Sequence, residues 1–486
     1  TEGRLHPQTW RGMSISGVIE PEFDLSHFAS FLPPDVAPRG RLSGRLTLGG
    51  TFASPTARAD LELQDLRFRR LPISRIALAA SWQGHTLGIE SLDLTSHGAL
   101  SLSGDLDLSP FLGGRGGRRG KGWHEVVPFV LDLSATRIDP ARWVTALAPK
   151  GGPRGLPPLT GILEGRLHLE GTLQRLSGEM KVRFAGAPFG VPGRVGLQAS
   201  LTHRSGETKF EKIAITAPGM KLSGEGNVAE GRVETALRLH LLDLRRSGDF
   251  LGRDAFPAGS ATLTLSGHFP LEAPRQRHAL QLTLRSEDLR IPGRIEFPSR
   301  LRLDATLRDG RVRLSGMRWE AGESRLSAQG SIDLLQKGRL RRNPPFSLTV
   351  ESERFDPTDF GGGAFPLSGK FSAQMTLDGK LEAPRGRLRL AGRDLALRGT
   401  PLGEGTLDIT LTNGRVGIES FLLRGTQGRI AMTGEIPLFS RGFRIAKDPR
   451  ISLHLLGEDL DPKRLHPTLP LAGAFSLEAE VTGTLH

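Results

Sequence analysis

The sequence predicts an all-β fold: an elongated, curled antiparallel sheet built from repeated units of about 100 residues, with short helices between them. Three observations support this prediction. Apolar and polar residues alternate with a period of two, turn-forming dipeptides separate the alternating runs, and one glycine-flanked pattern recurs along the chain. Successive side chains of a strand point to opposite faces, so each run has one apolar and one polar face.

The alternation is clear in the run that contains Leu301, Leu303 and Leu307, which share one parity, with polar and charged residues on the other. Asp309-Gly310 follows this run, and Asn413-Gly414 follows a later one. Such dipeptides favour tight hairpin turns. We therefore expect many short antiparallel strands joined by hairpins.

A longer repeat is superimposed on the alternation. The segment Gly40–Gly50 matches Gly161–Gly171, Gly369–Gly379 and Gly473–Gly483, and Gly259–Gly267 is a shortened copy. An Asp precedes each copy, commonly followed by Pro, at Asp24, Asp139, Asp243, Asp356 and Asp461. Asp as N-cap with Pro at the first helical position predicts a helix of one or two turns.

These starts divide the chain into one continuous array of repeats: residues 1–39 end a preceding repeat, and 40–160, 161–258, 259–368 and 369–472 are repeat units 1 to 4, followed by 473–486 as the truncated start of a fifth. The spacing predicts roughly eight to ten strands in each unit. The interrupted pattern at its end predicts that the sequence is a fragment of a longer protein.

Composition narrows the functional classes. The absence of cysteine excludes disulfides and thiolate metal sites. The net charge of +13 suggests anionic partners, but the arginines are dispersed, which favours a solvated face or lipid headgroups over nucleic acid. Gly113–Gly122 resembles an RNA-binding Arg-Gly segment; without an interleaved aromatic residue, a basic loop is the favoured interpretation. We predict no nucleic-acid partner.

No catalytic motif is present, so we predict that the protein is not an enzyme and has no catalytic residues, no metal site and no cofactor. His168, His240 and His454 occupy polar parity positions, where a solvated side chain is favoured over a metal ligand.

The apolar faces of so many strands must be covered. A curled sheet can do this by holding acyl chains in a groove, since each buried CH₂ contributes about 0.8 kcal/mol. The predicted lining of this lipid groove is Leu42, Leu46, Leu48, Leu100, Leu102, Leu167, Leu169, Leu197, Leu263, Leu265, Leu301, Leu303, Leu307, Met375, Leu377, Ile409, Leu411 and Leu453.

The repeated glycine strands, the Asp-Leu strand ends such as Asp65-Leu66 and Asp394-Leu395, and the Asp-Pro helices resemble the AsmA-like family, which includes AsmA, TamB and YhdP-type proteins. The resemblance covers essentially the whole chain. It implies a periplasmic β-groove tethered to the inner membrane through a segment not present in this chain. It also implies transfer of phospholipid between the inner and outer membranes in support of outer-membrane biogenesis.

The partners implied are phospholipid acyl chains, membranes at both ends and other envelope proteins. The alternative is a structural or adhesive β-solenoid that serves as an envelope scaffold without lipid transport.

Overall fold

The computed structural model describes residues 12–27, 39–68, 71–112, 127–147, 160–187, 193–250, 252, 257–270, 279–291, 295–336, 339–361, 367–426, 428–441, 444–445, 449–461 and 473–484. The chain forms two compact units, Thr1–Glu230 and Gly231–His486. The boundary between these units falls inside the predicted repeat 161–258. The predicted Arg-Gly loop Gly113–Gly122 lies outside the described residues.

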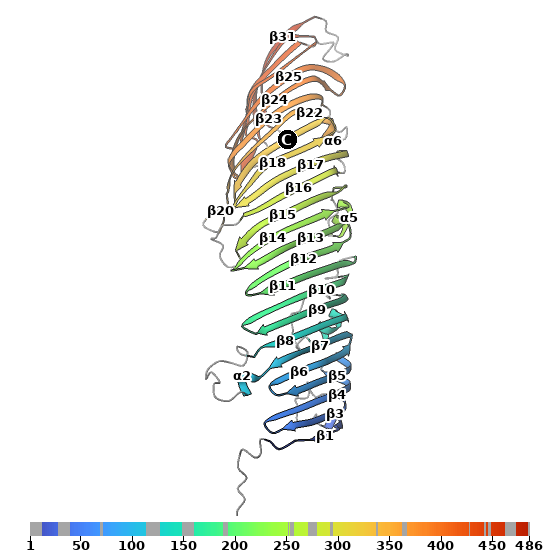
Figure 1. The fold of residues 1–486 in the computed structure, drawn as a ribbon. Coiled ribbons are helices and arrows are strands. Elements are labelled where there is room, and N and C mark those ends of the chain that lie inside the picture. Colours follow the sequence, from blue (N-terminus) through green and yellow to red (C-terminus); the bar gives the residue numbers. More distant parts are fainter. Residues whose placement is uncertain are drawn as a thin grey trace, which may run out of the picture. The chain divides into compact units, whose positions relative to one another are not determined.

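The first unit contains an antiparallel sheet whose consecutive strands pair in chain order from β3 to β13, with two short strands, β1 and β2, on the free edge of β3 (Figure 1). The strands are β1 Gly17–Ile19, β2 Glu22–Asp24, β3 Arg39–Thr51, β4 Ser54–Phe68, β5 Leu71–Gln83, β6 Thr86–Ser96, β7 Gly98–Asp107, β8 Phe129–Ile138, β9 Thr160–Thr172, β10 Arg175–Ala187, β11 Val195–Arg204, β12 Glu207–Ala217 and β13 Met220–Ala229.

The second unit continues the same design with 14 antiparallel strands in its sheet. They are β14 Arg232–Leu241, β15 Ala261–Pro270, β16 Ala279–Ile291, β17 Ile295–Arg308, β18 Arg311–Ala321, β19 Ser324–Asp333, β22 Pro345–Phe355, β23 Leu367–Lys380, β24 Ala383–Leu397, β25 Thr400–Thr412, β26 Arg415–Gly425, β27 Gly428–Ile436, β30 Arg450–Leu460 and β31 Phe475–Thr484. Two small hairpins project from it: β20 Leu335–Gln336 with β21 Arg339–Leu340, and β28 Phe439–Arg441 with β29 Arg444–Ile445.

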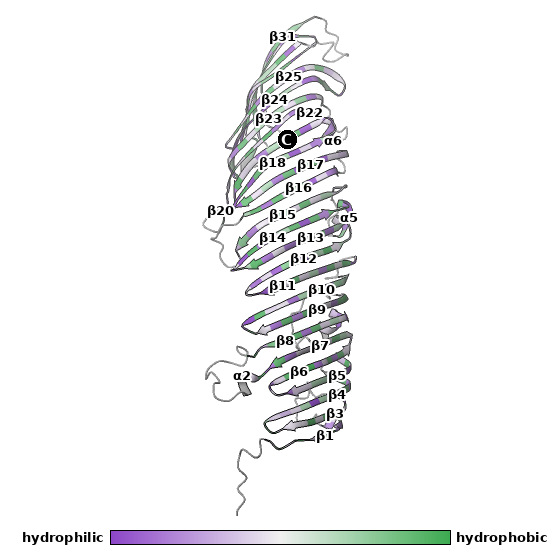
Figure 2. Cartoon of the chain, in the orientation of Figure 1, coloured by the Kyte–Doolittle hydropathy of each residue, from purple (hydrophilic) through white to green (hydrophobic). Residues whose placement is uncertain are grey.

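The all-β antiparallel fold with short punctuating helices is confirmed. Hydrophilic and hydrophobic residues alternate along the strands (Figure 2), and the long strands of the second unit bend, so that its sheet is curved (Figure 1). Each of the four full repeats contributes six strands to the sheet, beginning at β3, β9, β15 and β23, and most of these strands are ten to fifteen residues long. The hairpins β20–β21 and β28–β29 bring the third and fourth repeats to eight strands each, so the expected eight to ten strands are wrong for the first two repeats only.

The fourth strand of every repeat contains a bulge that the alternation alone did not reveal. The partner residues jump from Ile89 to Leu92 in β6, and equivalent jumps in β12, β18 and β26 are Phe210 to Ile213, Leu314 to Met317 and Ile418 to Phe421. At each bulge the bulged strand skips two residues where its partner strand skips one. The extra residue keeps the apolar residues on both sides of the bulge on the same face. A long strand can continue through a bulge instead of ending there, so a repeat of this length needs fewer strands in the sheet than expected.

The predicted helices are present after the capping aspartates. They are α4 Pro140–Leu147, α5 Leu244–Phe250 and α6 Thr358–Gly361; a further turn, α2 Ser109–Leu112, follows β7. Oδ1 of Asp139 accepts the backbone N–H of Ala141 at 3.1 Å, and Oδ1 of Asp243 accepts that of Arg246 at 3.0 Å. These bonds satisfy amides that have no partner within the helix. The helix predicted after Asp461 lies outside the described residues.

Fully buried apolar side chains are concentrated at the strand ends near the helices rather than in the middle of the sheets. Leu66, Leu71 and Ile73 form a core cluster, against which Trp143 of α4 packs. Among the described residues only 13 apolar side chains are buried. This small core closes one edge of the sheet and leaves most of the apolar face without a second layer.

The Asp-Leu motif of the sequence produces a second kind of bulge at this edge. Asp394 has a φ of 53° and Asp459 a φ of 52°, and each precedes a buried leucine, Leu395 at 7% exposure and Leu460 at 4%. The register shifts at both positions. The left-handed residue rotates the next side chain onto the apolar face, and Asp adopts this conformation more readily than β-branched residues do.

This geometry gives a stability prediction. Asp394→Val should lower the stability of β24 and β25 by about 1–2 kcal/mol, because a β-branched residue is strained at positive φ. Asp394→Gly should change it by less than about 0.5 kcal/mol, since glycine accepts that φ without strain but is freer in the unfolded chain. Hydrogen exchange of the amides in these strands measures the change. Arg393→Val, at ordinary φ, is the control, and an equal loss in both valine variants would contradict the bulge assignment.

Candidate functional site

The cross-strand register places all 18 predicted lining residues on the apolar face of their own unit. In the first unit Leu42 is opposite Leu63, and Leu167 lies between Leu133 and Met180. Directly opposed residues point to the same side, so tracing these pairs from strand to strand identifies the face. Leu100 lies on the row of Leu42, and Leu102 lies on the row of Leu167. The other predicted residues of the first unit lie on neighbouring rows of the same face: Leu46, Leu48, Leu169 and Leu197.

In the second unit the face is continuous from one end of the sheet to the other. A single row of opposed residues crosses all 14 strands and contains no charged or hydroxyl side chain: Leu239, Leu263, Leu284, Leu303, Met317, Ala328, Val350, Met375, Leu388, Ile409, Ile418, Gly434, Leu453 and Val481. The remaining predicted residues, Leu265, Leu301, Leu307, Leu377 and Leu411, lie on neighbouring rows of this face.

The first unit has two such rows side by side from β3 to β13. One contains Leu42, Leu63, Ile76, Leu94, Leu100, Ala135, Gly165, Val182, Ala199, Ile213 and Gly224; the other contains Gly44, Leu61, Leu78, Leu92, Leu102, Leu133, Leu167, Met180, Leu201, Phe210 and Gly226. At a strand spacing of about 4.8 Å, rows of 11 and 14 residues extend roughly 48 and 62 Å within their own units.

The side chains of this face are more exposed to solvent than those of an ordinary hydrophobic core. Of the 18 predicted residues, Leu411 is buried at 9% exposure and the others are only partly buried. Glycines on the face are covered by neighbouring leucines: a Cβ on Gly386 would lie 2.5 Å from Cδ2 of Leu377, and one on Gly434 would lie 2.7 Å from Cδ2 of Leu453. The leucines therefore lie partly over the adjacent strands and form a smooth apolar surface that is still accessible.

The opposite face is polar and carries many solvent-exposed ion pairs. Arg58 donates to both carboxylate oxygens of Glu90 at 3.0 and 2.8 Å, and Arg387 donates to Asp408, which lowers the pKa of that carboxyl group. These pairs connect neighbouring strands. Because they are solvent-exposed, each contributes little to stability.

The histidines singled out in the sequence also lie on this polar face. His168 donates from Nδ1 to Oδ1 of Asp132 at 2.8 Å, and His454 contacts Glu478 at 3.0 Å. The bond to Asp132 raises the pKa of His168, with a smaller opposing effect of desolvation. Within the described part of the chain no group of side chains is arranged to hold a metal ion.

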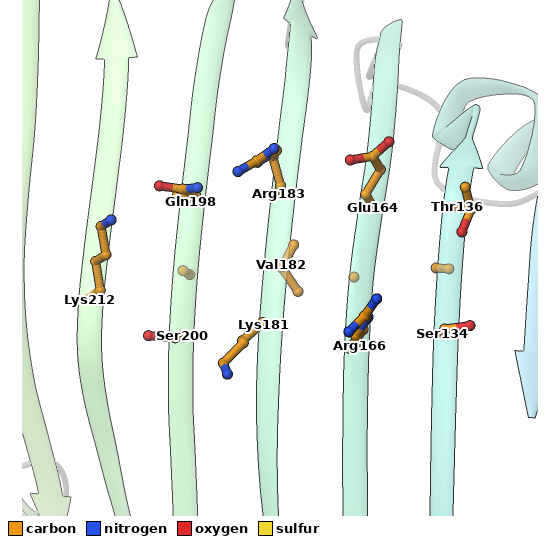
Figure 3. Close-up of a pocket in the computed structure, with 13 residues that line it drawn as sticks. Ser134, Thr136, Glu164, Arg166, Lys181, Val182, Arg183, Gln198, Ser200 and Lys212 are labelled. Atoms are coloured by element: carbon orange, nitrogen blue, oxygen red, sulfur yellow. The ribbon is translucent and has the colours of Figure 1, made fainter. Parts of the chain in front are cut away.

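Sequence reasoning did not find a hollow of about 700 Å³ on the polar face of β8–β12 (Figure 3). Its charged lining consists of Arg166, Lys181, Arg183, Lys212 and Glu164. The five come from β9, β10 and β12, so only the register brings them together. In the sequence, the one indication of this cluster is that basic residues occupy polar-face positions in several strands close together along the chain.

No helix among the described residues has the length and hydrophobicity needed to span a bilayer. Comparison with known proteins adds no assignment: no family model matches the chain, and neither a curated protein nor a solved structure matches it.

The His168–Asp132 pair gives a pH prediction. Asp132→Asn should lower the pKa of His168 toward its ordinary value, whereas Glu170→Gln should lower it less, because Glu170 acts only through its charge. The folded-state pKa is raised, so the pair's stabilisation is complete below the unfolded-state pKa and is lost as the pH rises through the folded-state value. NMR titration of the imidazole measures both shifts. An unchanged His168 pKa in Asp132→Asn would exclude the pair in solution.

Proposed function

We propose that the apolar faces bind phospholipid acyl chains and that the protein is an AsmA-like lipid-transfer conduit of the periplasm. In this proposal it carries phospholipid between the inner and outer membranes and is tethered to the inner membrane. The observation that carries the proposal is the unbroken register of accessible apolar residues across each sheet. A scaffold protein has no need to keep such a surface free of polar residues over its whole extent.

The energetics favour lipid as the occupant. A sixteen-carbon chain fully removed from water gains on the order of 12 kcal/mol at about 0.8 kcal/mol per CH₂. An open sheet face covers only part of each chain, so the gain per chain is a fraction of this value. Partial coverage suits transfer, because a lipid that is held too tightly does not move on.

The continuity of the rows supports movement along the sheet. Leu263 is opposed by Leu239 and Leu284, and Leu265 by Leu237 and Leu282, so a tail that leaves one strand meets another leucine on the next. No charged group has to be passed on these rows, and an unpaired charge in apolar surroundings would be costly. The polar face, with its ion pairs, remains in water.

Site-specific photo-crosslinking tests the binding surface. Crosslinkers at Leu301, Leu303 and Leu307 should capture lipid in membrane-derived protein, because these side chains share the apolar face. Crosslinkers at Arg302 and Arg308, on the polar face of the same strand, are the matched controls and should not. Mass spectrometry of the adducts identifies the lipid. Equal labelling of both faces, or no lipid adduct at all, would favour the scaffold or adhesion alternative.

Transport is tested by interrupting the apolar rows. Leu263→Asp with Leu265→Asp places two carboxylates in the path, and cells that depend on the protein should then show an outer-membrane permeability defect. Folding should survive, because stability in a repeat array comes mainly from neighbouring strands.

The control is Thr262→Asp with Thr264→Asp, on the polar face beside Arg285 and Arg238. This variant should maintain the permeability barrier. A stably produced Leu263/Leu265 variant that fully restores barrier function would exclude a conduit mechanism.

A further inference from the structure

The polar side chains of β8–β12 gather four cations around one hollow. Arg166, Lys181, Arg183 and Lys212 line one hollow with a single carboxylate, Glu164 (Figure 3). None of these four cations forms an ion pair with another described residue. Arginines elsewhere on the polar face, such as Arg58 and Arg387, are bound by carboxylates of neighbouring strands.

The register places like charges directly opposite each other. Arg166 is opposite Lys181, Lys181 is opposite Ser200, and Ser200 is opposite Lys212, so three cations stand on one row across four strands. Opposed side chains have Cβ atoms about 5 Å apart, at which like charges are destabilising. Arg183 lies two residues along the same strand, roughly 7 Å from Lys181. This arrangement opposes folding stability unless an anion occupies it.

The nearest carboxylates on the neighbouring row are already engaged. Asp132 accepts the bond from His168 at 2.8 Å, and Glu179 lies 3.7 Å from Arg204. Glu164 is the remaining acid at the hollow and balances one of the four cations. The residues that line the hollow therefore carry an excess of three positive charges.

The side chains between the cations are suited to a phosphate ligand. Arg166 and Arg183 each present a planar fork that binds two phosphate oxygens at once, and the lysines supply point charges. Neutral hydrogen-bonding groups complete the lining: Ser134, Thr136, Gln198 and Ser200. No aromatic side chain lines the hollow, so a stacked base has no support there.

We propose that this hollow binds a ligand carrying at least two phosphate groups. The volume of about 700 Å³ is within the usual range for small-molecule sites and exceeds what a single phosphate requires. The phosphates can belong to a soluble compound or to a lipid headgroup, since the recognition chemistry is the same. Nine of the 13 lining residues belong to the polar face, including all five charged ones, and the other four, Ala135, Gly165, Val182 and Ala199, belong to one of the apolar rows. The proposal rests on the charged residues and does not depend on lipid transfer.

Calorimetric titration with inorganic pyrophosphate tests the site. The parent protein should bind one equivalent, and Arg166→Gln with Lys181→Gln should weaken binding by about tenfold or more, as expected for losing charge-assisted bonds. The variant should melt no lower than the parent, because it relieves an opposed like-charge pair. Arg387→Gln with Arg415→Gln is the matched control: it removes two polar-face cations that are paired with Asp408 and Glu435.

The result that overturns the proposal is absence of pyrophosphate binding to the parent, or an equal loss in the two double variants, which would indicate non-specific attraction to a basic protein. Vesicle flotation separates the two ligand sources. Flotation with phosphatidylcholine vesicles containing cardiolipin, whose headgroup carries two phosphates, but not with phosphatidylcholine alone, and its reversal by pyrophosphate would identify headgroups. Pyrophosphate binding without flotation would identify a soluble ligand.

Discussion

The structure depends on strand register. Side chains alternate between faces with a period of two. A slip of one residue between any two strands would therefore move all the leucines of one strand from the apolar face to the opposite, solvent-exposed face. In both units the register keeps opposed apolar residues aligned strand after strand, as in Leu239, Leu263, Leu284 and Leu303. The hydrophobic effect favours this register at every pair. The same alignment places the ion pairs on the opposite face, where they act as a secondary reinforcement.

Bulges and helices preserve this alignment where a regular strand could not. The jump from Ile418 to Phe421 in β26 maintains the apolar face while bending the strand, and the left-handed Asp394 delivers Leu395 to the buried edge. Helices α4, α5 and α6 cover this edge, whereas the short turn α2 follows the opposite end of a strand, β7 (Figure 1). Packing is therefore tight along one margin and open over the middle of the face, and a ligand-binding surface can exist without weakening the core that holds the strand ends together.

Much of this architecture could be predicted from the sequence because it is local. Parity alone assigns residues such as Leu167 and Leu453 to one face, and the capping positions of Asp139 and Asp243 follow from short motifs. The bulges were missed because they appear as brief interruptions of the alternation. The cation cluster was missed because Arg166 and Lys181 become neighbours only through the turn after β9, whereas Lys212 joins them through two further strands. Long-range pairing has no signature in a single strand.

The six-strand repeat has a consequence for how such a chain can change in length. Six is even, so the strand that begins the next repeat runs in the same direction as the one that began the last, and its helix falls on the same margin. Duplication of one whole repeat would extend a sheet by about 29 Å and leave both faces intact. Duplication of three strands would reverse the direction and move the next helix to the hairpin margin. Whole repeats are therefore the steps by which a sheet of this design can grow while its apolar surface stays continuous.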